Sequence, residues 1–273
     1  MWKFRGKNRN QNLTRVLNLQ NQVNINFKAV LIAMYRRPKS LVAHCAPLRA
    51  VKSLKGKSNA SARWVRRQWN DPAVKQAKRE GLRSRAAFKL RELNDRFQLL
   101  RQGNVVIDLG AAPGGWTQVA VEATAPKRCT TDDPPRVVAV DLKRFDPVEG
   151  AVIIVGDFRQ SSVRKQLTET LRGRKADVVL SDMAPSFSGT FLTDSQHQLR
   201  LCHNALKIAE LYLRPGGNFA TKVLRCDGSE EFRAELKAVF DVVKAMKPQS
   251  SRPESTEMYF VAKGFKGITT LEN

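Results

Sequence analysis

Val105-Val-Ile-Asp-Leu-Gly-Ala-Ala-Pro-Gly-Gly-Trp116 is the stretch that decides the fold class of this chain. Its β-branched and apolar residues predict a buried strand that reaches Asp108 and Leu109. The glycines between Gly110 and Gly115 predict a tight turn, and an amphipathic pattern that begins at Trp116 predicts a helix. A strand, a glycine-rich turn and a helix in this order are typical of a nucleotide site at the carboxyl end of a strand.

The spacing of the glycines indicates which kind of nucleotide fits this turn. A dinucleotide fingerprint has glycine at its first, third and sixth positions, so that a pyrophosphate can approach the backbone. Here Ala112 occupies the third position, and Pro113 follows it. An adenosine that carries an amino acid suits the turn better, because its charged groups would meet backbone groups and Asp108. S-adenosylmethionine (SAM) fits this description, whereas a purely structural turn is the alternative from this stretch alone.

Strand and helix patterns alternate along the rest of the chain. Strands are predicted over 104–109, 136–142, 151–157, 176–182, 218–224, 242–246 and 257–263, and helices over 115–124, 161–171, 193–213 and 229–240. This alternation predicts an α/β, Rossmann-like fold with a mainly parallel seven-stranded sheet and helices on both faces. Pro215-Gly-Gly217 is expected to end the long helix before the strand that starts at Asn218.

Four acidic residues lie at or just beyond the predicted carboxyl ends of strands. They are Asp108, Asp141, Asp157 and Asp182. Because the ligand of an open α/β sheet lies over the carboxyl ends of its parallel strands, we expect these side chains to face the ligand. Asp141 is placed to accept hydrogen bonds from ribose hydroxyls, and Asp157 suits an adenine amino group.

The chain is strongly basic, with a net charge of +23 at pH 7 over 273 residues. Residues 1–70 contain 16 of its 48 Lys and Arg residues and no Asp or Glu, and the remainder is basic as well. This excess favours a polyanionic partner, because Lys and Arg side chains that neutralise phosphates release counterions. A basic surface that serves solubility alone is the alternative.

Other residue types limit the possible classes of protein. The longest apolar run, 29–35, is too short to span a bilayer, so no membrane insertion is expected. The cysteines are too far apart for a C-x-x-C motif and are expected to be reduced thiols, and the histidines show no ligand spacing, so no metal site is predicted. These residues are Cys45, Cys129, Cys202, Cys226, His44, His197 and His203.

The composition divides the chain into three parts. Residues 1–60 form a basic extension without acids, which is typical of an organellar transit peptide; a disordered arm that binds nucleic acid is the alternative. Residues 61–266 form the predicted folded domain, and 267–273 form a C-terminal tail. A transit peptide would place the protein in mitochondria, and the alternative locations are the cytoplasm and the nucleolus.

Basic helices are predicted over 61–95, at the start of the folded domain. Asp71-Pro72 predicts the cap and first turn of a short polar helix, and a second helix follows over 83–94. Basic side chains interleaved with tryptophans are typical of an RNA-facing edge. The residues concerned are Arg63, Trp64, Arg66, Arg67, Trp69, Lys75, Lys78, Arg79, Arg83 and Arg85.

Lys222 lies within an otherwise apolar predicted strand. A lysine in a buried strand costs free energy unless it is paired or uncharged. Its nearest candidate partner is Asp182, at the end of the neighbouring strand. From these two residues alone, a structural salt bridge and a chemical role both stay open.

Five motifs follow one another along the chain. They are Arg83-Ser-Arg-Ala-Ala-Phe-Lys-Leu90, Asp108-Leu-Gly-Ala-Ala-Pro-Gly-Gly-Trp116, Ser181-Asp-Met-Ala-Pro185, Thr221-Lys-Val223 and Ser250-Ser-Arg-Pro-Glu-Ser-Thr-Glu-Met-Tyr259. Together they resemble the FtsJ/RrmJ family of SAM-dependent methyltransferases, which act on ribose 2′-hydroxyls of RNA. The resemblance extends from about Ser61 to Lys263 without a missing block.

The resemblance implies a catalytic tetrad of Lys89, Asp182, Lys222 and Glu257. Lys222 would be the general base for the ribose hydroxyl, a role open only to its neutral form, which burial and the nearby charge of Lys89 would favour. The candidate SAM contacts are Asp108, Gly110, Pro113, Gly114, Gly115, Trp116, Asp141, Asp157 and Asp182. No metal is needed, since the sulfonium leaving group already carries positive charge.

The expected function is methylation of a ribose 2′-hydroxyl, of a uridine, in large-subunit rRNA during ribosome biogenesis, by a monomeric enzyme. The form of the glycine turn and the stretch from Ser250 to Arg252 look more like the rRNA branch of the family. Methylation of tRNA or of mRNA caps is the alternative within the family. A ribosome-assembly factor that binds RNA, and for which catalysis is secondary, is the alternative from another class.

Overall fold

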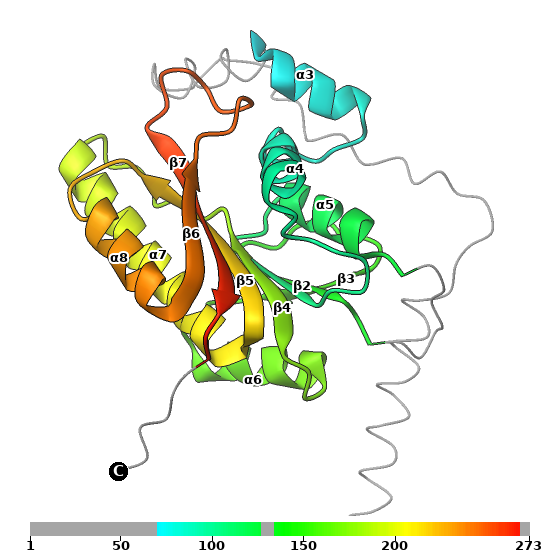
Figure 1. Ribbon diagram of the computed structural model, residues 1–273. Helices are drawn as coiled ribbons and strands as arrows, with labels where there is room; N and C mark the ends of the chain where they lie inside the picture. The colour runs from blue at the N-terminus through cyan, green and yellow to red at the C-terminus, as the bar shows by residue number, and fades with distance from the viewer. Residues whose placement is uncertain (1–69, 127–133, 268–273) are drawn as a thin grey trace, which may run out of the picture. The chain divides into compact units, whose positions relative to one another are not determined.

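The computed structural model describes residues 70–126 and 134–267 (Figure 1). All of the described residues belong to one compact unit. The predictions for the extension over 1–60, for the basic residues up to position 69 and for the tail lie outside the described residues.

The sheet has seven strands in the order β3-β2-β1-β4-β5-β7-β6. Their bounds are β1 Val106–Leu109, β2 Val137–Asp141, β3 Ala151–Val155, β4 Ala176–Ser181, β5 Leu213–Leu224, β6 Phe240–Met246 and β7 Glu257–Phe265. The pairs among β1 to β5 are parallel, and β7 runs antiparallel between β5 and β6. The predicted α/β fold with a mainly parallel sheet is therefore confirmed.

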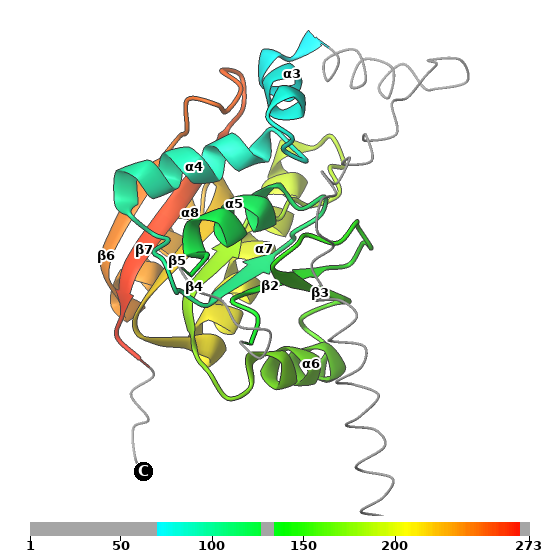
Figure 2. The same cartoon turned by 90° about the vertical axis from the view of Figure 1, so that its right-hand side faces the viewer.

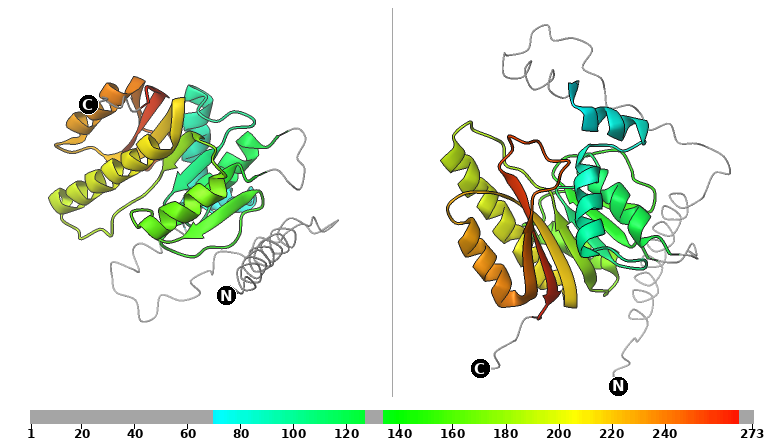
Figure 3. Two further views of the ribbon diagram at one scale, coloured as in Figure 1. Left: turned by 90° about the horizontal axis from the view of Figure 1, so that it is seen from below. Right: turned by 45° about the horizontal axis from the view of Figure 1, so that its top comes forward.

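Helices cover both faces of this sheet. Their bounds are α3 Pro72–Arg79, α4 Ala86–Phe97, α5 Gly115–Thr124, α6 Ser161–Leu171, α7 Phe191–Tyr212 and α8 Ser229–Val239. Figure 2 shows α4 and α5 over one face, and the view from below in Figure 3 shows helices on both sides of the sheet. None of the described helices has the length and apolarity needed to cross a bilayer.

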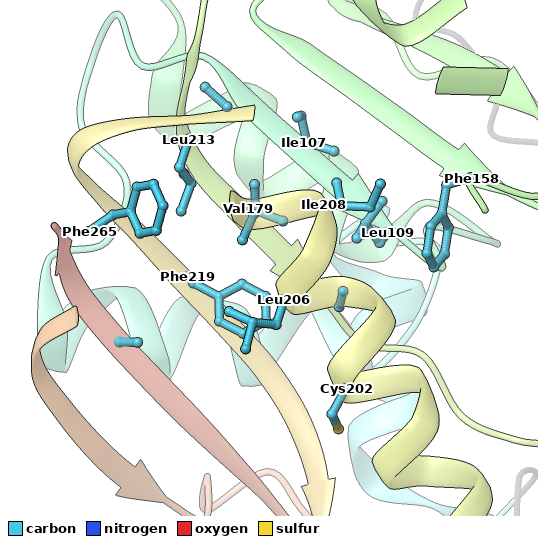
Figure 4. Packing of buried hydrophobic residues seen from close by; sticks show 14 of the residues in the cluster. Ile107, Leu109, Phe158, Val179, Cys202, Leu206, Ile208, Leu213, Phe219 and Phe265 are labelled. Atoms are coloured by element: carbon cyan, nitrogen blue, oxygen red, sulfur yellow. The ribbon is translucent and has the colours of Figure 1, made fainter. Parts of the chain in front are cut away.

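Alternation along the strands produces two cores, one on each face of the sheet. Val106, Val178 and Leu180 pack on the face that α4 and α5 cover. Ile107 and Val179, one residue further along, belong to the core on the other face. Figure 4 shows this second core. Strands buried on both faces explain the nearly continuous apolar runs in the sequence.

β5 begins earlier than predicted. The expected turn at Pro215-Gly-Gly217 lies inside the strand, which starts at Leu213. The pairing with β4 passes from Ala176 opposite Leu213 to Val178 opposite Asn218, so the extra residues of β5 form a bulge. Gly216 has φ of 78°, and such a conformation favours glycine. Proline and glycine do interrupt the regular strand pairing here, but they do so within β5 instead of before it.

The start of α3 agrees with the prediction. Asp71 is the N-cap residue, and its carboxylate accepts a hydrogen bond from the backbone N–H of Ala73 at 3.0 Å. Pro72 occupies the first helical position, where no N–H is needed. The cap therefore fixes where the chain enters the helices that precede β1.

Candidate active site

Asp108 is the most deeply buried acid at the carboxyl edge of the parallel strands. Its Oδ2 accepts a hydrogen bond from the Thr117 hydroxyl at 2.7 Å, whereas its Oδ1 has no hydrogen-bond partner among the described residues. Burial, together with the charges of Asp182 and Asp141, raises the pKa of Asp108 to about 7. The charges of the two other acids at this end of the sheet therefore act on Asp108.

The raised pKa of Asp108 predicts a pH dependence of stability. The unfolded carboxyl group loses its proton near pH 4, but the folded one keeps it up to about pH 7. The free energy of unfolding should therefore fall across this interval, by a few kcal/mol at about 1.4 kcal/mol per pKa unit. Urea unfolding of the wild type and of Asp108→Asn at pH 5, 6, 7 and 8 measures this, and the Asn variant should gain relative stability as pH rises. A constant difference between the two proteins would contradict the assignment.

The glycines of the turn make room for neighbouring parts of the same chain. A Cβ atom on Gly110 would lie 2.4 Å from Met183 Cγ, and one on Gly115 would lie 2.1 Å from Ser84 Oγ. Gly114, which caps α5, has φ of 105°, a conformation that other residues rarely adopt. The turn is thus packed between the loop after β4 and the start of α4, which brings the two segments to its sides.

The predicted SAM contacts within the turn differ in exposure. Pro113 is exposed, and its carbonyl accepts a hydrogen bond from the Arg83 guanidinium at 3.4 Å. The same guanidinium donates to the backbone carbonyls of Asp146 and Pro147. The indole of Trp116 is buried and donates to the carbonyl of Ala86 at 2.8 Å. Arg83 therefore ties the turn to the loop after β2, and its predicted contact with RNA stays a prediction.

Asp141 and Asp157 follow neighbouring strands. Asp141 accepts hydrogen bonds from the backbone N–H groups of Ala112 at 2.9 Å and Lys143 at 2.7 Å. Asp157 pairs with Arg159 at 2.6 Å, and this contact outweighs partial burial and lowers the pKa of Asp157. A carboxylate has about four acceptor sites, so Asp141 keeps capacity for ligand hydroxyl groups. Asp157 accepts four hydrogen bonds from the backbone and side chain of Arg159, so a ligand amino group would replace one of them.

These residues fit SAM by the chemistry of their side chains. In the ionised form of Asp108, the unpartnered Oδ1 is a buried acceptor, and a buried acceptor without a partner costs free energy until a donor reaches it. An ammonium group on the ligand would supply that donor. Asp108 suits the amino-acid end of SAM, and Asp141 and Asp157 suit its nucleoside end.

The four residues of the predicted tetrad come together on the face of the sheet that α4 covers. Lys89 Nζ lies 2.9 Å from Glu257 Oε2, and Lys222 Nζ lies 3.2 Å from Asp182 Oδ1. Lys222 Nζ also donates to the backbone carbonyl of Asp182 at 2.9 Å. Both lysines are buried, with 7% and 6% of their surface exposed. The contributing elements are α4, the end of β4, β5 and the first residue of β7.

Charges within the tetrad affect its members. Burial raises the pKa of Glu257, but the ammonium charges of Lys89 and Lys222 outweigh that effect, so the pKa lies below its usual range. Glu257 is therefore an anion at neutral pH. This partly buried anion holds the Lys89 ammonium in a fixed place.

Tyr259 is a site residue to which the sequence analysis gave no role. It lies opposite Lys222 in the pairing of β5 with β7, and its hydroxyl donates to Asp182 Oδ1 at 2.7 Å. Its ring lies under Lys89 Nζ, with 5.6 Å from the nitrogen to the ring centroid. Burial and the charges of Asp182 and Glu257 raise the pKa of Tyr259, so it stays a donor. Period-two spacing from Glu257 is the sequence signal that places it on the same face.

Gln198 on α7 also reaches the site, and nothing in the sequence indicated this. Its Nε2 donates to the carbonyl oxygens of Lys222 at 2.8 Å and Met183 at 3.2 Å. Cys202 Sγ donates to the Lys222 carbonyl as well, at 3.1 Å. The pairing of β5 with β4 ends one residue before Lys222, so these side chains bind the Lys222 carbonyl beyond the last residue pair of β4 and β5.

A cleft of about 310 Å³ opens beside the tetrad. Lys89 and Glu257 line it together with Arg85 and Arg252. Figure 1 shows the start of α4 and the loop between β6 and β7, which contribute these arginines, at the same end of the sheet. The carboxylate of Glu254 lines the cleft as well, so three cationic side chains face two carboxylates. The excess of one positive charge, with two guanidinium groups among the cations, suits a ligand with negative charges.

Comparisons with known proteins agree with this geometry. A family model described as FtsJ-like methyltransferase matches residues 82–265. The ribosomal RNA large subunit methyltransferase E of Anaplasma phagocytophilum is 46% identical over 222 residues, covering 81% of this chain and 88% of the relative. The protein of the same name from Parvibaculum lavamentivorans is 46% identical over 220 residues, covering 80% and 86%.

A solved structure supports the fold as well. It is the crystal structure of a Plasmodium falciparum protein described as a ribosomal RNA methyltransferase, with a TM-score of 0.59 and 29% sequence identity. The match covers 68% of this chain and all of that chain. Since the family model matches more than half of the sequence, and the relatives span most of it, this chain belongs to the FtsJ-like methyltransferase family and is a SAM-dependent enzyme.

Proposed function

We propose that this enzyme methylates a ribose 2′-hydroxyl, of a uridine, in large-subunit rRNA. The observation that carries the proposal is the pairing of buried Lys222 with Asp182 and of Lys89 with Glu257 at the edge where β1, β2 and β4 end. A ribose hydroxyl is a poor nucleophile, and its proton must be removed by a group held in place. The relatives named as rRNA methyltransferases support the substrate class.

Lys222 is the proposed general base. SAM supplies a methyl group on a sulfonium sulfur, so the ribose oxygen forms a C–O bond as the S–C bond breaks. Lys222 takes the hydroxyl proton in its uncharged form, after its ammonium has released a proton to solvent, while Asp182, which also accepts the hydroxyl of Tyr259, keeps Nζ directed at that oxygen. Lys89, held by Glu257, adds positive charge where the alkoxide develops.

Labelled methyl transfer tests the substrate. Large-subunit rRNA, tRNA and capped mRNA are each incubated with the enzyme and SAM carrying a labelled methyl group. Label should enter large-subunit rRNA, and preference for tRNA or for the cap would replace the proposed substrate by one of the family alternatives. In cells that lack the protein, rescue of ribosome assembly by Lys222→Ala would favour the assembly factor instead.

SAM binding should depend on Asp141 and Asp157. Replacing either by alanine removes hydrogen bonds to the ligand, each worth about 1–3 kcal/mol when the acceptor is charged, so the Kd for SAM should rise about tenfold or more. RNA affinity should change little. Calorimetric titration with SAM and a separate RNA titration measure both. Normal SAM affinity with weakened RNA binding would mean that these two acids face the RNA instead of SAM.

RNA binding should depend on basic residues at the start of the domain. Each phosphate contact contributes about −0.9 for duplex or −0.7 for single strands to the log–log salt slope. Replacing Arg85, Lys75 and Lys78 together by glutamine should therefore flatten the slope by about two to three units. The slope is measured from Kd values over a range of KCl concentrations. An unchanged slope would place the RNA surface elsewhere.

We also propose that residues 1–60 direct the protein to mitochondria. The support is their composition, which is rich in Lys and Arg and lacks acids. A fusion of residues 1–60 to a fluorescent protein tests the idea, because a transit peptide moves the fusion into mitochondria and a nucleic-acid-binding arm does not.

A further inference from the structure

We propose that Asp71 is a positioning residue of the RNA-binding cleft, whose carboxylate holds Arg85 and Arg252 in the orientation that backbone phosphates require. The inference rests on the proposed function, since it assumes that RNA enters the cleft beside Lys89 and Glu257. It adds a residue that makes no contact with the reacting atoms. Asp71 was predicted only as the cap of a helix.

The two oxygens of Asp71 have different partners. Oδ1 accepts the backbone N–H of Ala73 at 3.0 Å and so caps α3. Oδ2 accepts hydrogen bonds from Arg252, at 3.1 Å from Nη2 and 3.3 Å from Nε, and from Arg85 Nη1. Only 9% of the Asp71 side chain is exposed, and 16% and 27% of the arginine side chains. One buried carboxylate therefore joins two guanidinium groups that are far apart in sequence.

The loop between β6 and β7, which carries Arg252, is fastened to α4 by further contacts. Glu92 accepts a hydrogen bond from the backbone N–H of Ser250 at 2.9 Å, and Arg85 donates to the Ser250 carbonyl. Within the loop itself, Lys247 donates to the carbonyl of Ser255 at 2.7 Å. The same loop leads to Glu257 of the tetrad, so the arginines are held at a fixed distance from the catalytic lysines.

The arginines keep donors for a ligand. A guanidinium group has five N–H donors in a rigid planar fork, and a fork already held in place loses less entropy when it binds a phosphate. Both arginines line the cleft beside the tetrad. Asp71 also lines the neighbouring cleft of about 520 Å³ together with them. RNA that enters would find two oriented cations instead of two mobile side chains.

Two physical effects of Asp71 on RNA affinity oppose each other, so the direction in which its removal changes that affinity tests the proposal. Asp71 places a negative charge close to the cleft, so electrostatics alone predicts that its removal strengthens RNA binding. Positioning predicts that its removal weakens RNA binding, because the arginines become mobile. The direction of the change in Kd therefore separates the two effects.

Asp71→Ser is the informative variant, because serine still caps a helix N-terminus but cannot bridge two arginines. We expect the Kd of the full-length enzyme for large-subunit rRNA to rise about tenfold. The log–log salt slope should become flatter by about 0.7 to 0.9 units, which corresponds to the loss of one phosphate contact. The SAM Kd and the rate constant at saturating RNA should stay within twofold. Asp95→Ser, at an exposed position of α4, removes the same charge and should leave RNA affinity unchanged.

A double-mutant cycle shows whether Asp71 acts through the arginine. If it does, the losses caused by Asp71→Ser and Arg252→Gln should be clearly less than additive, because only the effect through Arg85 remains once Arg252 is replaced. RNA binding by Asp71→Ser as tight as the wild type or tighter, or full additivity with Arg252→Gln, would overturn the proposal. Asp71→Asn keeps one acceptor oxygen, which can still cap α3, but it loses the oxygen that bonds the arginines. It gives the same comparison if the serine variant does not fold. Failure of the wild type to methylate rRNA would instead refute the proposed function.

Discussion

Replacing Lys222 by alanine should lower the single-turnover rate constant of methyl transfer by a factor of about 10² or more, the usual scale for loss of a general base. The protein should still fold and bind SAM, because the predicted SAM contacts come from other residues. The reaction is measured with the target RNA at saturating SAM. A normal rate constant would exclude Lys222 from the chemistry.

Lys222→Arg separates a proton acceptor from a mere positive charge. A guanidinium group does not lose its proton near neutral pH, so it cannot accept the proton of the ribose hydroxyl. The Arg variant should therefore be about as inactive as the Ala variant across the pH range. Near-normal transfer by the Arg variant would show that position 222 supplies only charge, and the general-base role would have to be withdrawn.

Replacing Asp182 by alanine should have the largest effect on stability. It removes the acceptor of the buried Tyr259 hydroxyl and the charge partner of the buried Lys222 ammonium, which keeps only its hydrogen bond to the backbone carbonyl of residue 182. Removing one partner of a buried ion pair costs about 3–5 kcal/mol, and we expect a loss of that size in the free energy of unfolding. Urea unfolding at pH 7 measures this loss.

Glu122→Ala is the matched control for Asp182→Ala. Glu122 pairs with Arg91 at 3.3 Å, but 69% of its side chain is exposed. Exposed ion pairs contribute about 0–1 kcal/mol, so this variant should stay within that range. Equal destabilisation by the two substitutions would contradict the buried pairing of Asp182. Asp182→Asn, which keeps an acceptor for Tyr259, should be destabilised less than Asp182→Ala.

Two members of the tetrad could be predicted from the residues alone because each departs from what its place in the sequence would otherwise favour. Lys222 is a charge within an apolar strand, and Asp182 follows a strand whose end meets the ligand in this fold class. Parallel pairing then places them as neighbours, since β4 and β5 pair up to Ser181 and Thr221. Lys89 and Glu257 came only from family resemblance, because a lysine on a basic helix shows no departure from an ordinary surface residue.

Other features depend on tertiary contacts that leave no local pattern. The sequence predicts that Arg83 contacts RNA, and it gives no sign that the Arg83 guanidinium also donates to backbone carbonyls of the loop after β2. Gln198 has no unusual place on its helix, yet it binds the Lys222 carbonyl at 2.8 Å. The early start of β5 depends on a bulge that lets glycine and proline lie within a strand. Each of these outcomes depends on which distant segment becomes a neighbour.

Alkaline hydrolysis of the methylated RNA tests the central claim most directly. Large-subunit rRNA is incubated with SAM and the wild-type enzyme or Lys222→Ala, hydrolysed in alkali and examined at single-nucleotide resolution. Since a 2′-O-methyl group removes the hydroxyl that attacks the neighbouring phosphate, one uridine should become resistant to cleavage with the wild type and with no other sample. Transfer of label from SAM without any resistant position would show that a base is methylated, and would contradict the ribose chemistry proposed for Lys222.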